Sequence, residues 1–438
     1  MNRSQVRGNS IIMGRVGHAP GAGYVPCPLE SNSLDLTPAE VRARFRWAAR
    51  QGHPQWLWPE IGVHAWRAAL QQIASITRDV MTAGSSRRAL DGDAAATGIG
   101  GLTSGMGPLL GYWLERGAVI ATPAVAAILD LHLRHNRVRM ARMADRAEMV
   151  SGVLAEAAVS HTLLKGMHTA FDYFPEPGTR PLSDIDLLIH PSDEDRASDV
   201  LLAHGFEPGL AHAYPAERSW RPSDSPREPR SLCLAHADDP WTVDLHTSLD
   251  RRYAAAAPII RLDRLRADVS ADPGRQTLAE PLLALSLAVH ASCGLSNLTM
   301  IRLVELALVV RRDFGADAAS WGPLVTAAER AGALGMIYPA LRLCEQLVPG
   351  TVPEEVGLRV EREAPPRVRR VVDPLTPGDA QRLVRCSLAE RFMWAPSPLT
   401  IARQVLHEIF PPGSASPATL AAIYRARMWR LARRTLTQ

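Results

Sequence analysis

The stretch HTLLKGMHTAFDYFPEPGTRPLSDIDLLIH, residues 161–190, is the part of the chain around which the rest is arranged, and it contains most of the candidate site residues. Within it, Lys165 is the only lysine in a chain of 438 residues, whose basic residues are otherwise all arginine. A coding bias towards arginine codons explains the scarcity of lysine elsewhere, but this one position escaped it. An ammonium group is a compact point charge, whereas a guanidinium group is a wide planar fork. We therefore expect Lys165 to be required as lysine.

The apolar run DIDLLI at the end of this stretch predicts a buried strand with an acidic face. Successive side chains of a strand point to opposite faces, so Asp184 and Asp186 project to one side while Ile185 and Leu187 pack on the other. Two adjacent carboxylates raise each other's pKa unless a cation lies between them. Hard carboxylate oxygens suit Mg²⁺. The run therefore indicates a metal site, and the alternative is the solvated polar edge of an ordinary strand.

Between these features lies a second candidate element, an anion site. We expect a strand at residues 162–165, a close turn that Gly166 makes accessible, and a short helix at residues 167–173. A strand that ends in a glycine turn at a helix N-terminus can bind anions through unpaired N–H groups and the helix dipole. Arg180 follows in the loop that leads to the aspartates. It could contact phosphate oxygens, or it could form an ion pair that holds the aspartates apart.

A third carboxylate is expected from a later strand. Two apolar runs, SLCLAHA and WTVDLHTSL, flank a turn at residues 238–240, which predicts a β-hairpin. Asp244 and His246 share one face of its second strand. A two-metal site requires such a carboxylate from a strand next to the first two.

Composition restricts the class of protein. Hydrophobic residues make up 46% and charged residues 21%, which is typical of a globular protein. The net charge of +4 is mild and spread along the chain, so we do not expect nucleic acid as a partner. The cysteines are odd in number and form no CxxC, which predicts reduced thiols. They are Cys27, Cys233, Cys293, Cys344 and Cys386. No signal peptide or membrane span is evident, so we expect a cytoplasmic protein.

The chain divides into six predicted regions. They are a disordered leader at 1–35, an N-terminal helical region at 36–158, a core at 159–275, a helical bundle at 276–348, a linker rich in Pro and Arg at 349–377, and a basic helical segment at 378–438. The glycine-rich residues 98–107 are interpreted as a flexible connector, because no strand precedes them and no GK[ST] follows. Residues 215–229 are interpreted as a loose surface segment, and His290 as a core histidine.

Several of these motifs together resemble a known family. The pieces LLKG, GTRPLSDIDLLI, VDLH, LAVHA and FPP, within about residues 125–415, resemble a nucleotidyltransferase family of the polymerase-beta-like superfamily. The resemblance implies an α+β fold, in which a small mixed sheet is flanked by N-terminal helices and a C-terminal helical bundle. It also implies two Mg²⁺ ions and transfer of a nucleoside monophosphate from an NTP to an acceptor hydroxyl, with release of pyrophosphate.

The same resemblance assigns roles to individual residues. Asp184 and Asp186 would bind the metals that hold the triphosphate, and Asp244 would bind the second metal and help to deprotonate the acceptor. Gly166 would stand at the nucleotide-facing turn. The wider superfamily has Gly-Ser at this turn and a shorter loop, whereas this chain has Met167 after the glycine.

The missing serine leaves the phosphate contacts to other groups, for which Lys165 and Arg180 are the candidates. His246 could orient Asp244 or the acceptor, or could make a plain structural hydrogen bond. ATP is the expected nucleotide and a small molecule or a peptide the expected acceptor. Two alternatives remain at this point, an NTP-dependent phosphotransferase and a degenerate transferase that binds a protein partner. The oligomeric state is not predicted.

Overall fold

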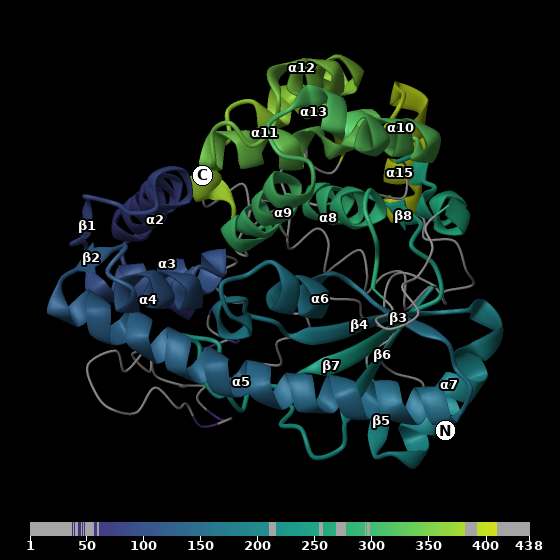
Figure 1. Cartoon of the computed structure of the whole chain (residues 1–438), viewed down its shortest axis with the longest axis horizontal. Helices are drawn as coiled ribbons and strands as arrows, with labels where there is room; N and C mark the ends of the chain where they lie inside the picture. The colour runs from purple at the N-terminus through teal and green to yellow at the C-terminus, as the bar shows by residue number, and fades with distance from the viewer. Residues whose placement is uncertain are drawn as a thin grey trace.

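The computed structural model shows a small sheet enclosed by helices (Figure 1). It describes residues 61–209, 216–253, 257–268, 277–293, 298–381 and 392–409, with Leu295 and scattered residues between 37 and 58. The predicted leader and most of the predicted basic C-terminal segment lie outside the described residues.

Five strands form a mixed sheet in the order β3-β4-β7-β6-β5. They are β3 (His161–Leu163), β4 (Asp184–Ile189), β5 (Phe206–Pro208), β6 (Glu217–Pro222) and β7 (Thr242–His246). β4 and β7 are parallel, and the other neighbouring pairs are antiparallel. The predicted α+β fold with a small mixed sheet is confirmed.

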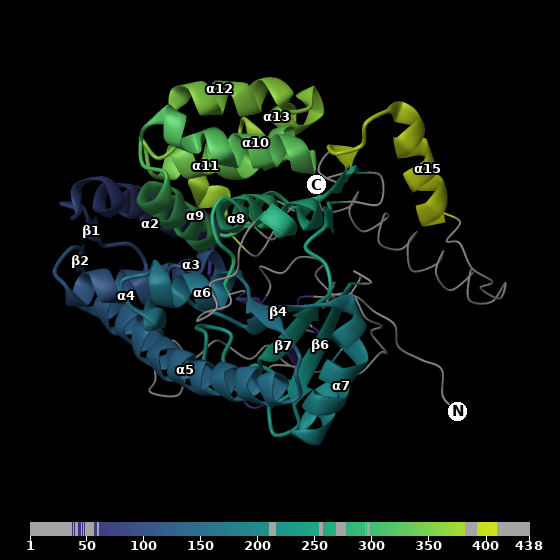
Figure 2. The ribbon, with the colours of Figure 1, turned by 45° about the vertical axis from the view of Figure 1, so that its right-hand side comes forward.

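The two faces of the sheet pack against different helices. Ile185 and Leu187 are fully buried in one core with apolar side chains of α5 (Pro123–Glu156) and α7 (Glu194–Ala203). Leu188 points the other way and belongs to the core of the helical bundle. Figures 1 and 2 show α5 along one side of the sheet and helices α8 and α9 on the other. Because side chains alternate along β4, its two aspartates face the bundle.

The bundle is larger than the sequence predicts. Its helices are α8 (Leu282–Ser292), α9 (Met300–Asp313), α10 (Gly322–Ala331), α11 (Tyr338–Leu347), α12 (Glu354–Glu363) and α13 (Pro366–Val372). The predicted linker at 349–377 is therefore wrong, because it contains α12 and α13. Their prolines stand at helix starts, where a missing N–H costs nothing, and Val356 and Val360 are buried one turn apart.

The N-terminal helices join the same bundle core. They are α2 (Val63–Ala83), α3 (Ala94–Ser104) and α4 (Gly107–Glu115), with the short strands β1 (Ala89–Leu90) and β2 (Ile120–Ala121) between and after them. Ile73 and Ile76 of α2 share one hydrophobic cluster with Leu303 of α9. The predicted regions 36–158 and 276–348 thus share this cluster, while Trp66 and Ile99 of the N-terminal region belong to a second, smaller one.

The glycine-rich residues 98–107 are not the predicted flexible connector, because they form α3 and the start of α4. The glycines allow close helix packing. A Cβ atom on Gly98 would lie 2.7 Å from Cγ2 of Ile128, and one on Gly107 would lie 2.4 Å from Nδ1 of His132. Asp93 caps α3 by accepting a hydrogen bond from the N–H of Ala96.

Two other predictions near the sheet are wrong. The run SLCLAHA forms no strand, because the Asp239 carboxylate accepts hydrogen bonds from the backbone N–H groups of Arg230 and His236 and closes a loop there. β7 pairs with β4 and β6 instead of forming that hairpin. Residues 217–222, predicted as loose surface chain, form β6, in which Trp220 is buried.

Two further α-helices and a pair of short strands remain. They are α6 (Lys165–Asp172), β8 (Arg251–Arg252), β9 (Ile259–Ile260) and α15 (Pro398–Ile409). Among the described cysteines, Cys293 and Cys344 have free thiols. None of the helices in the described part of the chain has the length and apolar character that crossing a membrane requires.

Candidate active site

The parallel pairing of β4 with β7 brings the three predicted aspartates together. Asp186 lies opposite Asp244 in the register of the two strands, and Asp184 lies opposite Thr242. One carboxylate oxygen from each of Asp184, Asp186 and Asp244 lies within 4.8 Å of the others. Asp186 and Asp244 are buried. Because side-chain direction alternates along β4 and β7, the pairing of these two strands is sufficient to place three carboxylates in one cluster.

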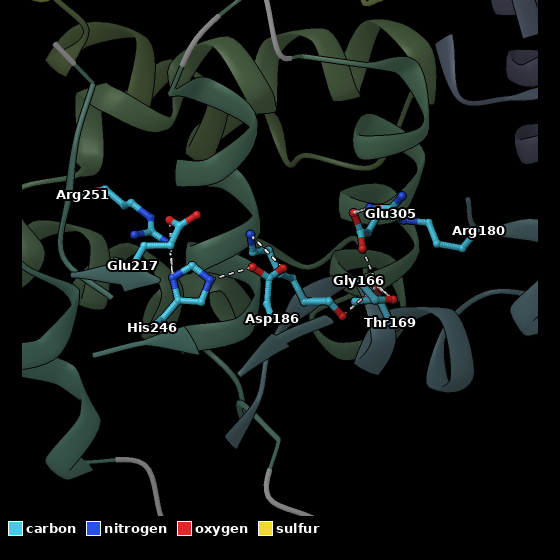
Figure 3. A network of polar contacts seen from close by, with 9 residues as sticks. Gly166, Thr169, Arg180, Asp186, Glu217, His246, Arg251 and Glu305 are labelled. Atoms are coloured by element: carbon cyan, nitrogen blue, oxygen red, sulfur yellow. Dashed lines mark hydrogen bonds and ion pairs between the residues drawn. The ribbon is translucent and has the colours of Figure 1, made fainter. Parts of the chain in front are cut away.

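Both oxygens of Asp186 are bound by basic side chains (Figure 3). Lys165 Nζ lies 3.1 Å from Oδ2, and His246 Nε2 lies 2.7 Å from Oδ1. The sequence left three roles open for His246, which were to orient Asp244, to orient the acceptor or to make a structural hydrogen bond. The structure pairs its side chain with Asp186, and not with Asp244. Asp244 is held from the other side, because Ser219 on β6 donates a hydrogen bond of 2.6 Å to its Oδ1.

The other ring nitrogen of His246 faces a pair of opposite charges. Its Nδ1 lies 3.5 Å from Nη2 of Arg251 and 3.6 Å from Oε2 of Glu217. Figure 3 shows both side chains beside the imidazole, at the end of the site away from Gly166. The polar network thus continues past the aspartates onto β6 and β8.

The pKa values of the three carboxyl groups reflect their burial and their closeness to one another. Burial, and then the charge of Asp186, raises the pKa of Asp184 above its ordinary value. Burial, followed by the charges of Asp184 and Asp186, raises the pKa of Asp244 to about 7. Burial also disfavours ionised Asp186, but the Lys165 ammonium and the His246 hydrogen bond outweigh it and hold its pKa well below the usual range.

Such a cluster fits a divalent cation. A second positive charge near Asp184 and Asp244 would favour their ionised forms, since an opposite charge within a few ångströms lowers a carboxyl pKa. Three hard oxygen donors in a partly closed site match the ligand preference of Mg²⁺.

Lys165 and Gly166 form the first turn of α6. Gly166 is buried, and a Cβ atom on it would lie 2.5 Å from Cδ2 of Leu182. Its φ is not in the left-handed region. The glycine is thus needed for the close approach of the loop before β4, whereas the sequence suggested that it frees the backbone for a turn.

Arg180 is buried and its guanidinium is bound within the interior. Its Nη2 lies 2.8 Å from Oε2 of Glu305 on α9, and its Nη1 donates a hydrogen bond of 2.7 Å to the carbonyl of Pro181. Within the described residues it forms no ion pair with the aspartates. Its charge acts on Asp184 only as a minor cause that lowers the pKa.

Several residues around the site could not be predicted from the sequence. Ser219, Glu217 and Arg251 come from elements that leave no linear motif. Glu305 and Arg302 had a weak signal, because they stand three residues apart in the otherwise apolar run MIRLVELALVV.

His290 is more than the predicted core residue. Burial, and then the charge of Lys165, lowers its pKa well below the usual value, and Arg302, Asp186 and Arg251 also act on it. The imidazole therefore lies among the charges of the site. Since His290 stands on α8 and Arg302 on α9, these two bundle helices adjoin the aspartates.

The fold and the site together define a class of protein. A small mixed sheet with carboxylates on two adjacent parallel strands, covered by helices, is the arrangement that the resemblance to nucleotidyltransferases implies. Residues 103–349, more than half of the chain, match a family described as "Uncharacterised nucleotidyltransferase", and the chain belongs to this family. No curated protein and no solved structure matches the chain.

Proposed function

We propose that this protein is a Mg²⁺-dependent nucleotidyltransferase that transfers a nucleoside monophosphate from an NTP, most readily ATP, to the hydroxyl group of a small molecule or a peptide. The observation that carries the proposal is the cluster of Asp184, Asp186 and Asp244, whose carboxylate oxygens lie within 4.8 Å of one another. Family membership supports it. The proposal includes a cytoplasmic location, because nucleoside triphosphates are made and used there.

Asp184, Asp186 and Asp244 would hold two Mg²⁺ ions, which supply charge neutralisation for the triphosphate and for the attacking oxygen. In the reaction, a bond forms between the acceptor oxygen and the α-phosphorus, and the bond from that phosphorus to the β-phosphate oxygen breaks. The hydroxyl proton leaves the acceptor, and pyrophosphate departs. Asp244 would help to remove that proton, with its carboxylate held in place by Ser219.

Lys165 would offset negative charge on the departing pyrophosphate. Its side chain is 14% exposed and adjoins Asp186, so its ammonium faces the cluster at the first turn of α6. Preorganised cations stabilise charge that develops in a transition state. Gly166 would let the nucleotide approach this turn. His246 would orient Asp186, because its Nε2 lies 2.7 Å from that carboxylate.

Product analysis tests the proposal. The protein would be incubated with Mg²⁺, each of the four NTPs, and a cell extract as the source of acceptor, and pyrophosphate and nucleoside diphosphate would be measured separately. We expect pyrophosphate from the wild type and none from Asp184→Asn. Asp130→Asn is the matched control, because Asp130 forms an exposed ion pair on α5. Nucleoside diphosphate would identify a phosphotransferase. No product, with no binding of Mg·NTP, would contradict both enzymes and favour a protein-binding role.

A further inference from the structure

Glu305 is a buried carboxylate in an apolar helix. Its residue is 2% exposed, and both of its oxygens are used. Oε1 accepts a short hydrogen bond from the hydroxyl of Thr169 on α6, and Oε2 is paired with Arg180 at 2.8 Å. A buried charge of this kind is costly unless it is paired, and removing one partner leaves the other uncompensated. The Glu305 side chain therefore connects three parts of the chain, which are α9, α6 and the loop before β4.

Both partners of Glu305 lead directly to the site. Thr169 stands four residues after Lys165 on α6, so the two lie one above the other on the same helix face. Lys165 in turn lies 3.1 Å from Asp186. Arg180 precedes β4, and its second hydrogen bond holds the Pro181 carbonyl of the connecting loop. The carboxylate thus links the helix that carries the ammonium to the loop that delivers the aspartates, as Figure 3 shows.

We infer that Glu305 is a positioning residue for Lys165, and that Arg180 acts on the reaction through Glu305 and not on the nucleotide. This inference rests on the proposed function. It makes α9, and with it the helical bundle, part of the active site. The guanidinium keeps the Glu305 carboxylate in place, and Glu305 holds α6 so that Lys165 stays beside Asp186.

The single lysine of the chain allows a direct test. Protein labelled with [ε-¹³C]lysine has one side-chain signal, from Lys165. Two variants weaken the link at different points. Glu305→Gln removes the charge, and Thr169→Val removes one hydroxyl while it leaves the Arg180 ion pair intact. Glu329→Gln is the control, because it breaks an exposed ion pair with Arg359 on the far part of the bundle. Thermal unfolding confirms that each variant is folded, and Thr169→Val decides if Glu305→Gln does not fold.

We expect the Lys165 signal to shift or broaden in both link variants and to stay unchanged in the control. In pyrophosphate release, kcat should fall about 10- to 100-fold, as for other residues that orient groups bound in a reaction centre. KM for Mg·ATP should change little, because the displaced ammonium acts mainly in the transition state.

The inference is overturned if the Lys165 signal coincides with that of the wild type in both variants, or if the signal moves while kcat equals that of the control. A wild-type protein without pyrophosphate release contradicts the proposed function and the kinetic part of this inference, but not the positioning of Lys165 by Glu305. In that case the Lys165 signal alone decides: a shift in the link variants supports the positioning role, and coincidence with the wild type refutes it.

Discussion

Lys165 balances the charge of the aspartate cluster, and replacing it with methionine tests that balance. Methionine keeps the length and flexibility of the side chain and removes the ammonium. Lys165 Nζ lies 3.1 Å from Asp186, and the two side chains are 14% and 7% exposed. The change therefore leaves a carboxylate that Asp184 and Asp244 already repel. Within the described part of the chain, His246 is then its one remaining side-chain partner.

The expected loss of stability follows from the burial of the Lys165–Asp186 ion pair. Breaking a buried ion pair by removing one partner costs about 3–5 kcal/mol, because the remaining charge stays desolvated. We expect the low end, about 3 kcal/mol, since the His246 hydrogen bond to Asp186 remains. Replacing Asp186 with asparagine in the same protein removes the orphaned charge. The double variant should thus recover most of the lost stability.

Chemical denaturation at pH 7.5 without divalent cations measures these free energies. The two single variants and the double variant give the coupling energy between Lys165 and Asp186. Added Mg²⁺ should stabilise Lys165→Met more than the wild type, because the cation replaces the lost counter-charge. A Lys165→Met variant within about 0.5 kcal/mol of the wild type would refute the reasoning, since that is the range of an ordinary surface substitution.

Three further predictions concern the scaffold. Gly111→Ala should destabilise the protein in thermal unfolding, because a Cβ atom at this position would lie 2.4 Å from the Leu129 carbonyl oxygen. Gly152→Ala should stabilise it by about 0.5–1 kcal/mol, because a Cβ atom there would have no neighbour within 4 Å. Burial raises the pKa of Glu280 from 4.5 to about 7. Between these two pH values the folded state keeps a proton that the unfolded state loses, so the free energy of unfolding falls as pH rises. Glu280→Gln should therefore stabilise the protein by about 3 kcal/mol at pH 8 and hardly at pH 4. Arg139→Met should cost about 3 kcal/mol in denaturant unfolding, because Arg139 donates to four carbonyls in the segments before β4 and β7. A stabilising effect of Glu280→Gln that is equal at pH 4 and pH 8, or an unaffected Arg139→Met variant, would contradict the respective argument.

The two strands that carry the aspartates could be predicted from the sequence, because the pattern that specifies each strand lies within a few consecutive residues. In DIDLLI and VDLH, alternation alone fixes which side chains share a face. Lys165 could be singled out because its residue type is unique in the chain.

The surroundings of the aspartates could not be predicted, because they depend on pairing between distant segments. Ser219 reaches Asp244 only because β6 lies antiparallel to β7, and the sequence showed the residues of β6 as a Pro- and Arg-rich stretch. Arg180 lies 125 positions from Glu305 in the chain, so no local pattern reveals their ion pair. Proline content likewise suggested a linker at 349–377, although Pro353 and Pro365 stand at helix starts.

We propose that the three aspartates form a divalent metal site for a nucleotide. Manganese binding measured by electron paramagnetic resonance tests it most directly, with the wild type and Asp244→Asn in the presence of an ATP analogue that cannot be cleaved between the α- and β-phosphates. We expect two Mn²⁺ ions for each wild-type chain with the analogue, and fewer in the variant. Mn²⁺ binding that is absent from the wild type, or equal in the two proteins, would contradict it.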